Sequence, residues 1–88
     1  MASGTAIIKD PKGLHLRAAT YFSGEALKYK CSVKIRSGNA TLNAKSVLGV
    51  LGTCAKYGDE VELICNGEDE EEAVAKLIEI LKELNIEE

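Results

Sequence analysis

The sequence predicts an α+β fold: an open-faced two-layer sandwich, in the order β-α-β-β-α-β-α, with a four-stranded, mainly antiparallel sheet and three helices on one face. Segments of alternating apolar and polar residues, typical of half-buried strands, are interspersed with segments whose apolar residues recur every three or four positions, as in helices. With 88 residues, the chain is expected to form a single domain over residues 1–88. Because such strands cannot leave their apolar face open to water, the helices are expected to cover it.

The first half of the chain is predicted to contain a strand, a helix and a hairpin. Residues 5–9 form the first strand, and the Pro- and Gly-containing loop 10–13 closes it. A helix follows from Leu16 to about Leu27, since Ala19, Phe22 and Ala26 have the spacing of one helical face. Residues 31–36 alternate as a second strand, and Ser37-Gly38-Asn39 turns the chain back into a third strand over 40–43.

The second half is predicted to contain a short helix, a strand and a long helix. Ser46 is expected to cap a helix over 47–52, because its hydroxyl can accept a hydrogen bond from an N–H of the first turn. Residues 60–65 alternate as the fourth strand. Asp69 and Glu72 have the spacing of a capping box for the last helix. Its apolar stripe comprises Ala73, Val74, Leu77, Ile78, Leu81 and Leu84.

Charge is distributed unevenly along the chain, although the formal net charge is only −3. Residues 1–58 carry nine Lys and Arg against two acidic residues, whereas residues 59–88 carry two Lys against twelve acidic residues. The basic part favours anionic ligands or acidic partner surfaces. Because a general nucleic-acid-binding domain is usually basic overall, we do not expect the chain to bind nucleic acid.

The cysteine pattern and the lengths of the apolar runs argue against a metal-binding or membrane-spanning protein. Three widely spaced cysteines and one histidine form no metal-ligand pattern, so no metal site is predicted and the thiols are expected to be small buried residues in a reducing cytoplasm. The longest apolar run, 47–51, is far shorter than the roughly 20 residues that span a bilayer. No export signal precedes the first strand. We therefore expect a cytoplasmic protein without membrane insertion.

The most informative stretch is Gly13–Ala19, because it places His15 at the start of a predicted helix. The first N–H groups of a helix have no partner within the helix, and the peptide dipole is positive there. A phosphoryl group attached to His15 would meet donors already in place. Arg17 adds a cationic donor two residues on. On composition alone, a single histidine beside a helix cap is also an ordinary surface residue.

Three motifs in the expected order and spacing resemble the HPr family, the histidine-containing phosphocarriers of the bacterial phosphoenolpyruvate-dependent sugar phosphotransferase system. Gly13-Leu14-His15, with Arg17 and Ala19, is similar to the family's phosphohistidine motif. Asn43-Ala44-Lys45-Ser46, before a short apolar helix, is similar to its regulatory-serine motif. Residues 69–73 resemble the start of its last helix, so the resemblance extends over nearly the whole chain.

The resemblance implies that His15 accepts a phosphoryl group from Enzyme I on its Nδ1 (pros) nitrogen and passes it to sugar-specific IIA proteins. Neutral imidazole is a suitable nucleophile at cytoplasmic pH, and its phosphoramidate is labile enough to be passed on. Arg17 would stabilise the phosphoryl oxygens, unless it is simply a solvated helix residue. The protein would be a carrier rather than an enzyme, and it would need no cofactor.

The resemblance also implies that Ser46 is a regulatory phosphorylation site. An HPr kinase/phosphorylase would modify it, and a transcriptional regulator is a further expected partner. The added negative charge would repel an acidic partner, although Ser46 also has the ordinary role of a helix cap. We expect Leu16, Val47, Leu48 and Leu51 to form the partner-binding surface, with the last three serving either as a docking patch or as part of the core. The protein is expected to be monomeric.

Two residues depart from the family pattern and leave other functions open. Leu16 stands where the family usually has alanine, and Ala18 stands where it usually has proline. These two departures affect the expected choice of partner more than the expected phosphorylation. One alternative is therefore a paralogue that serves a nitrogen-related or dihydroxyacetone-type relay. A more distant alternative is a small RNA-binding module, because Gly49-Val50-Leu51-Gly52 matches a G-x-x-G loop. Its apolar middle residues are unsuited to gripping phosphates.

Overall fold

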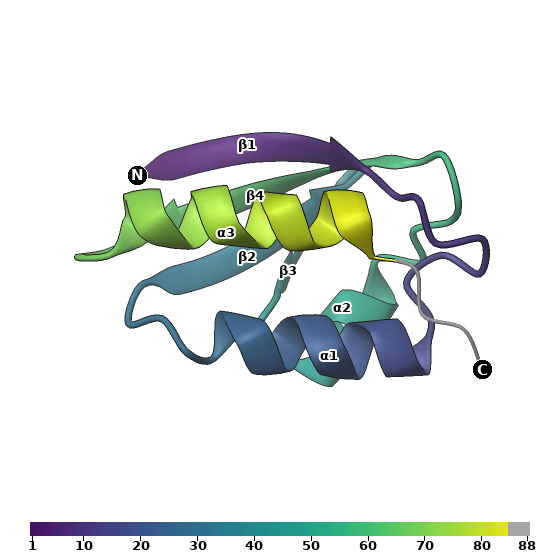
Figure 1. The fold of residues 1–88 in the computed structure, drawn as a ribbon, viewed down its shortest axis with the longest axis horizontal. Helices are drawn as coiled ribbons and strands as arrows, with labels where there is room; N and C mark the ends of the chain where they lie inside the picture. Colours follow the sequence, from purple (N-terminus) through teal and green to yellow (C-terminus); the bar gives the residue numbers. More distant parts are fainter. Residues whose placement is uncertain (85–88) are drawn as a thin grey trace.

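The computed structural model describes residues 1–84, and within them the elements follow one another in the predicted order (Figure 1). The strands are β1 (Ala2–Ile7), β2 (Ser32–Ser37), β3 (Ala40–Asn43) and β4 (Glu60–Asn66). The helices are α1 (Leu16–Ala26), α2 (Val47–Gly52) and α3 (Glu70–Glu83). The first strand therefore begins and ends earlier than the predicted 5–9, because its pairing with β4 starts at Ala2.

The four strands form one sheet in the order β1-β4-β2-β3, and all neighbours are antiparallel. β4 therefore lies in the middle, although it is the last strand in the sequence. Leu63 of β4 is opposite Gly4 of β1 on one side and Ile35 of β2 on the other. Because residues alternate between the two faces of a strand, this register places the apolar residues of the central strands on the same face.

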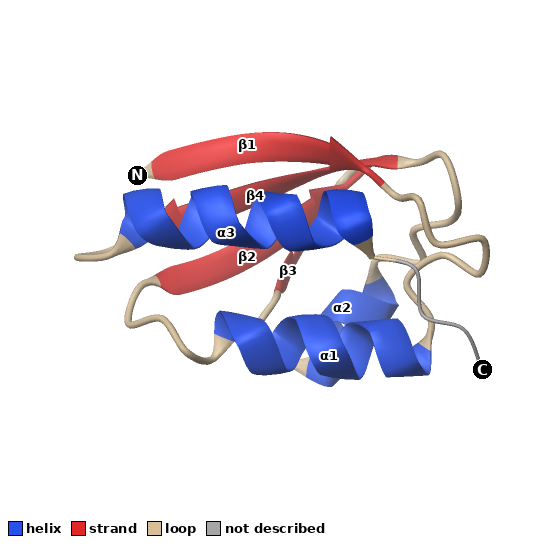
Figure 2. Cartoon of the chain, in the orientation of Figure 1, coloured by secondary structure: helices blue, strands red, loops and turns tan. Residues whose placement is uncertain are grey.

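The three helices cover that face of the sheet and leave the other open (Figure 2). α3 lies over β1 and β4, α2 contacts β3, and α1 packs beside α2 and α3. Gly4 permits the close approach of α3, since a Cβ atom there would lie 3.3 Å from Ile78 Cγ1. On the open face, Lys34 and Arg36 are exposed, and Arg36 Nη2 pairs with Glu62 Oε1 at 2.7 Å. The predicted two-layer sandwich is confirmed.

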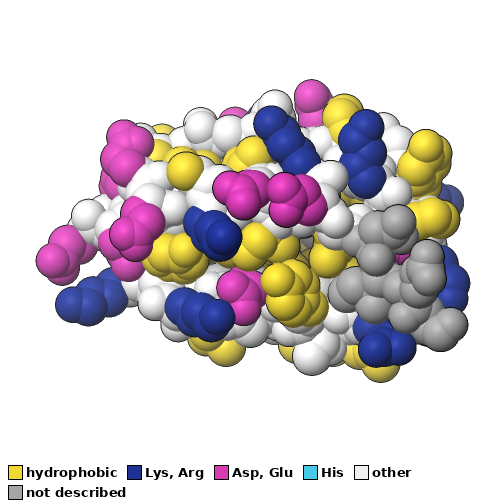
Figure 3. All heavy atoms as spheres, viewed as in Figure 1, with side chains coloured by type: hydrophobic (Ala, Val, Ile, Leu, Met, Phe, Trp, Pro, Cys, Tyr) yellow, Lys and Arg dark blue, Asp and Glu magenta, His cyan; other side chains and the backbone are white. Residues whose placement is uncertain are grey.

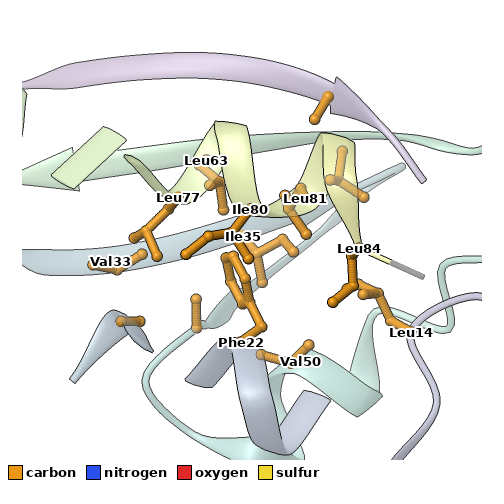
Figure 4. Close-up of a cluster of buried hydrophobic side chains, with 14 of the residues drawn as sticks. Leu14, Phe22, Val33, Ile35, Val50, Leu63, Leu77, Ile80, Leu81 and Leu84 are labelled. Atoms are coloured by element: carbon orange, nitrogen blue, oxygen red, sulfur yellow. The ribbon is translucent and has the colours of Figure 1, made fainter. Parts of the chain in front are cut away.

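The core lies between the helices and the sheet (Figure 4). Phe22 of α1 is fully buried there, in a cluster to which β1, β2 and β4 contribute buried side chains and against which Leu42 of β3 packs. In α3, Leu77, Ile80 and Leu81 are buried, whereas Val74 and Ile78 of the predicted stripe are only partly buried. Ile80 was not in the predicted stripe. Leu14, just before α1, belongs to the same cluster, so the core extends to the loop that carries His15.

The predicted capping box at the start of α3 is wrong. Asp69 is the N-cap residue, but its side chain makes no cap hydrogen bond. Its two carboxylate oxygens instead accept the backbone N–H groups of Lys30 and Cys31, at 2.9 and 2.8 Å. The pKa of the Asp69 carboxyl is lowered, first of all by the Lys30 N–H. Asp69 therefore ties the start of α3 to the segment before β2.

The cysteines differ from one another in their surroundings. Cys31 and Cys65 are buried as expected, whereas Cys54 is exposed, contrary to the expectation. Burial raises the pKa of the Cys65 thiol to about 12. Cys54 has a φ of 54°, in the left-handed region.

Within residues 1–84, the helices are all too short or too polar to cross a membrane.

Candidate functional site

His15 is the N-cap residue of α1, as the motif predicted. Its backbone is extended, with φ −79° and ψ 179°, and its carbonyl oxygen accepts the Ala19 N–H at 2.8 Å. The N–H groups of residues 16–18 therefore come before the Ala19 N–H, which is the first donor within the helix. They have no partner within the helix and lie at its positive end. The His15 side chain is 17% exposed, so a partner can reach the ring while the protein still restricts its orientation.

Gly13 and Leu14 explain why the histidine is held in this place. Gly13 has a φ of +71°, and a Cβ atom there would lie only 2.5 Å from the Ala55 carbonyl oxygen. The Leu14 N–H donates to that same oxygen at 3.0 Å, and its side chain is buried in the core. Glycine allows the close approach, leucine anchors the loop, and the next residue is presented at the helix start.

Asp10 is a site residue that the local sequence pattern does not reveal, because the pattern predicts only a loop at this position. It is fully buried, and its Oδ2 atom lies 3.2 Å from His15 Nε2. Its Oδ1 atom accepts the Lys12 N–H at 2.9 Å. The sequence signal is weak, because an acidic residue before Pro-Lys-Gly is also an ordinary turn residue. Only the fold shows that the carboxylate points inward, at the imidazole.

Arg17 is the second residue of α1 and its side chain is exposed. Within the described part of the chain it forms no ion pair, so no carboxylate neutralises it there. Together with Leu16, Thr20 and Tyr21 it lines a shallow depression on α1. The Leu16 side chain is 62% exposed. A cationic group and an exposed apolar group therefore lie on the helix turn that follows His15.

The molecule separates this site from its most acidic segment. α1 and α3 run in opposite directions, so the start of α1 lies at the other end of the molecule from the start of α3 (Figure 1). Acidic side chains gather at the left end in Figure 3, where α3 begins, and the first turn of α3 contains the acidic residues 70–72. The direction of the helices therefore keeps this acidic first turn of α3 away from the start of α1.

Ser46 caps α2 as predicted, and its Oγ atom accepts the Gly49 N–H at 3.3 Å. The predicted partner-binding residues of this helix fall into two groups. Leu48 is 79% exposed, whereas Val47 and Leu51 are partly buried against the core. Because α1 and α2 pack against each other, the exposed Leu16 and Leu48 belong to neighbouring helices.

The G-x-x-G segment does not form the loop that an RNA-binding module requires. Residues 49–52 lie inside α2, and Val50 is fully buried. Gly49 packs against the Asn43 carbonyl so closely that a Cβ atom would not fit. The segment therefore serves helix packing, and the G-x-x-G loop on which the RNA-binding alternative rests is not formed.

Fold and site together define a small α+β protein built around one histidine at a helix start. The family model described as "PTS HPr component phosphorylation site" matches residues 2–83. The phosphocarrier protein HPr of Lysinibacillus sphaericus is 34% identical over 77 residues, 88% of each chain. The HPr-like protein Crh of Bacillus subtilis is 38% identical over 71 residues, 81% of this chain and 84% of Crh. This chain belongs to the HPr family of bacterial phosphotransferase-system phosphocarriers.

Solved structures agree with this assignment. The crystal structure of HPr-C-His from Thermoanaerobacter tengcongensis superposes with a TM-score of 0.87 at 34% identity, covering 92% of this chain and 91% of that one. A crystal structure of Crh from Bacillus subtilis, described as a swapped dimer, has a TM-score of 0.77 at 32% identity and covers 99% of this chain and 100% of that one. The fold and the family resemblance are confirmed, while the expected monomer gains no support from this relative.

Proposed function

We propose that the chain carries phosphoryl groups on His15 Nδ1, accepting them from phosphorylated Enzyme I and passing them to IIA proteins for sugar uptake. The observation that carries this proposal is the position of His15 at the N-cap of α1 with its Nε2 atom on the Asp10 carboxylate. Family membership supplies the reaction class. In this function the protein acts in the cytoplasm as a carrier and needs no cofactor.

The site supports phosphoryl capture in two ways. The N–H groups at the start of α1 are donors for the phosphoryl oxygens, and they need no rearrangement because the helix already orients them. The exposed Arg17 guanidinium, two residues along, adds a cationic donor that can form paired hydrogen bonds. The backbone donors remain if Arg17 is removed, so Arg17 assists transfer without being indispensable.

Leu16 and Leu48 are the residues best placed to contact partner proteins. Both are large apolar side chains and both are mostly exposed, on helices that pack together. An exposed apolar side chain directly after the reactive histidine, with another on the helix that packs against α1, is typical of a protein-docking surface. Val47 and Leu51 are partly buried and pack against the core.

Leu16 favours a second candidate function with the same chemistry and different partners. It is a bulky residue directly after His15, where the family usually has alanine, and it is 62% exposed. A IIA protein shaped for alanine would meet extra volume at the point of transfer. Purified IIA proteins of sugar and non-sugar relays, each supplied with the phosphorylated chain, would distinguish the candidates by their rates of labelling.

The primary test is phosphorylation by Enzyme I and phosphoenolpyruvate, followed by mapping of the modified residue. His15→Ala should abolish labelling, and labelling that persists in this variant would show that the acceptor is elsewhere. Arg17→Ala should slow transfer about tenfold or more, because one charged donor is lost. Arg36→Ala is its matched control, since Arg36 lies on the open face and pairs with Glu62. Equal rates for the two arginine variants would remove Arg17 from the mechanism.

We also propose that phosphorylation of Ser46 weakens docking to Enzyme I. Ser46 is partly exposed and lies two residues before the exposed Leu48. A phosphate adds about −1.5 to −2 charge at pH 7, which is unfavourable beside an apolar contact or an acidic partner. Ser46→Asp should lower the affinity for Enzyme I in a titration, whereas Ser3→Asp, which adds the same charge on β1, should not. Identical affinities would contradict the switch.

A further inference from the structure

We propose that Asp10 is a positioning residue that keeps the proton of the neutral His15 ring on Nε2 and thereby makes Nδ1 the nitrogen that accepts the phosphoryl group. This inference rests on the proposed function. Its basis is a contact between two side chains of the loop before α1: Asp10 Oδ2 lies 3.2 Å from His15 Nε2. The Asp10 carboxylate is fully buried, whereas the imidazole remains partly exposed.

The loop determines which way the Asp10 carboxylate faces. Its Oδ1 atom accepts the Lys12 backbone N–H at 2.9 Å, and its own carbonyl oxygen accepts the Gly13 N–H at 2.8 Å. These bonds to backbone donors close the loop around the side chain. With Oδ1 held in this way, Oδ2 is the oxygen presented to the imidazole. A buried carboxylate needs such partners, because an unpaired one would carry a large desolvation penalty.

The Asp10 contact has a direct chemical consequence for the ring. A carboxylate only accepts hydrogen bonds, so the nitrogen facing Oδ2 must carry the proton. In the neutral ring the other nitrogen, Nδ1, then carries the lone pair. In hydrolase triads a buried aspartate holds the tautomer of a histidine by the same logic.

The transfer step balances on this basis. The lone pair of Nδ1 forms the new N–P bond, while the bond between phosphorus and the donor atom of Enzyme I breaks and its electron pair stays with that atom. The proton on Nε2 does not move during this step. The His15 ring gains positive charge as the bond forms, and the Asp10 carboxylate stabilises that charge from the Nε2 side.

A purely structural role for Asp10 makes a different prediction from a positioning role. If Asp10 only braces the loop, asparagine is the mild substitution and alanine the severe one, because asparagine keeps the shape and the acceptor for the Lys12 N–H. If Asp10 sets the tautomer, the order is reversed. In Asp10→Asn the Lys12 N–H holds the amide oxygen on its own side, so the NH₂ group faces the ring and requires Nε2 to accept. The proton would then move to Nδ1.

The experiment compares wild type, Asp10→Asn and Asp10→Ala, with Asp59→Asn as the matched control. Asp59 also accepts a backbone N–H, that of Lys56 at 2.9 Å, but it is exposed, so the control removes a loop carboxylate with a similar backbone bond and no burial. Because the chain contains a single histidine, ¹⁵N-histidine labelling yields only two ring-nitrogen signals. Their chemical shifts, measured well above the pH at which imidazole is protonated, distinguish the nitrogen that carries the proton from the one that does not.

We expect the proton on Nε2 in wild type and in Asp59→Asn, and on Nδ1 in Asp10→Asn. The rate of phosphorylation by Enzyme I should fall by about ten- to a hundredfold in Asp10→Asn, the range expected for losing a hydrogen bond to a charged group, and by less in Asp10→Ala. A wild-type spectrum with the proton on Nδ1 would overturn the inference even if a variant failed to fold. So would an Asp10→Asn protein that transfers at the wild-type rate.

These outcomes separate the inference from the proposed function. If wild type takes no phosphoryl group on His15, the proposed function fails, and the kinetic role of Asp10 fails with it. If wild type is phosphorylated on His15 but Asp10→Asn keeps the wild-type tautomer, or Asp10→Ala is slower than Asp10→Asn, the inference alone fails. Mapping phosphate to Nε2 rather than Nδ1 in wild type would refute both the inference and the Nδ1 acceptor named in the proposed function.

Discussion

Replacing Gly13 with alanine tests whether the loop that presents His15 depends on close packing. Gly13 lies two residues before the histidine and has a φ of +71°. A Cβ atom there would lie 2.5 Å from the Ala55 carbonyl oxygen and 2.9 Å from Lys56 Cα. Both are backbone atoms, so neither can move aside as a flexible side chain would. Alanine must therefore displace the loop that carries the Leu14 anchor and the reactive ring.

The expected loss of stability has two parts. A non-glycine residue in the left-handed region costs about 1–2 kcal/mol. Inserting a methyl group into a space already filled costs about 1–3 kcal/mol more. Gly13→Ala should therefore lower the free energy of unfolding by about 2–5 kcal/mol. Gly38→Ala is the control, because Gly38 has a φ of +60° but no atom within 4 Å of its Cβ position, and it should cost only the first part.

Urea unfolding followed by circular dichroism measures both free energies, and phosphorylation by Enzyme I measures the effect on the site. Gly13→Ala should be less stable than Gly38→Ala by about 1–3 kcal/mol, and only the former should slow transfer. Equal losses of stability in the two variants would refute the reasoning, because they would show that contact with Ala55 adds nothing to the cost of the backbone conformation.

Two further predictions concern groups away from His15. At pH 8 a thiol-alkylating reagent should label the exposed Cys54 of the folded protein and leave Cys65, whose pKa burial raises to about 12, unmodified until the protein is denatured; mass spectrometry that found both labelled equally would contradict this. The second concerns Asp69, whose carboxyl pKa is lowered chiefly by the Lys30 N–H. A lowered pKa means that the stabilisation is complete above the ordinary carboxyl pKa and is lost as pH falls through the folded-state value. Unfolding curves of wild type and Asp69→Asn should therefore differ at neutral pH and converge in acid, whereas a constant difference would rule out this linkage.

Local patterns were enough to predict the elements because each depends on residues close together in the sequence. The periodicity of Phe22 and its neighbours predicted α1, and the short side chain of Ser46 predicted the start of α2. The prediction failed at Asp69, where the spacing of a capping box was present but the carboxylate binds amides 38 and 39 residues away. A local motif has no means of signalling such a distant competitor.

In the candidate site, too, local patterns predicted some features and missed others. The position of His15 at a helix start followed from the motif, since glycine, an apolar anchor and a histidine have distinct local roles. Asp10 was missed, because its orientation depends on how the loop closes over the core and not on any spacing. The exposure of Leu48 and the partial burial of Val47 and Leu51 were likewise undecided, since a six-residue helix is too short for its apolar pattern to define one face.

The sequence by itself determined the order of the elements, the two-layer architecture and the histidine at the start of α1, because periodicity, capping chemistry and turn residues act over a few positions. Only the tertiary structure decided that β4 lies between β1 and β2, that the Ala55 carbonyl holds the Gly13–Leu14 loop, and that a buried carboxylate faces the imidazole. These contacts join residues whose proximity is set by the packing of the whole chain, and for that reason no local pattern encodes them.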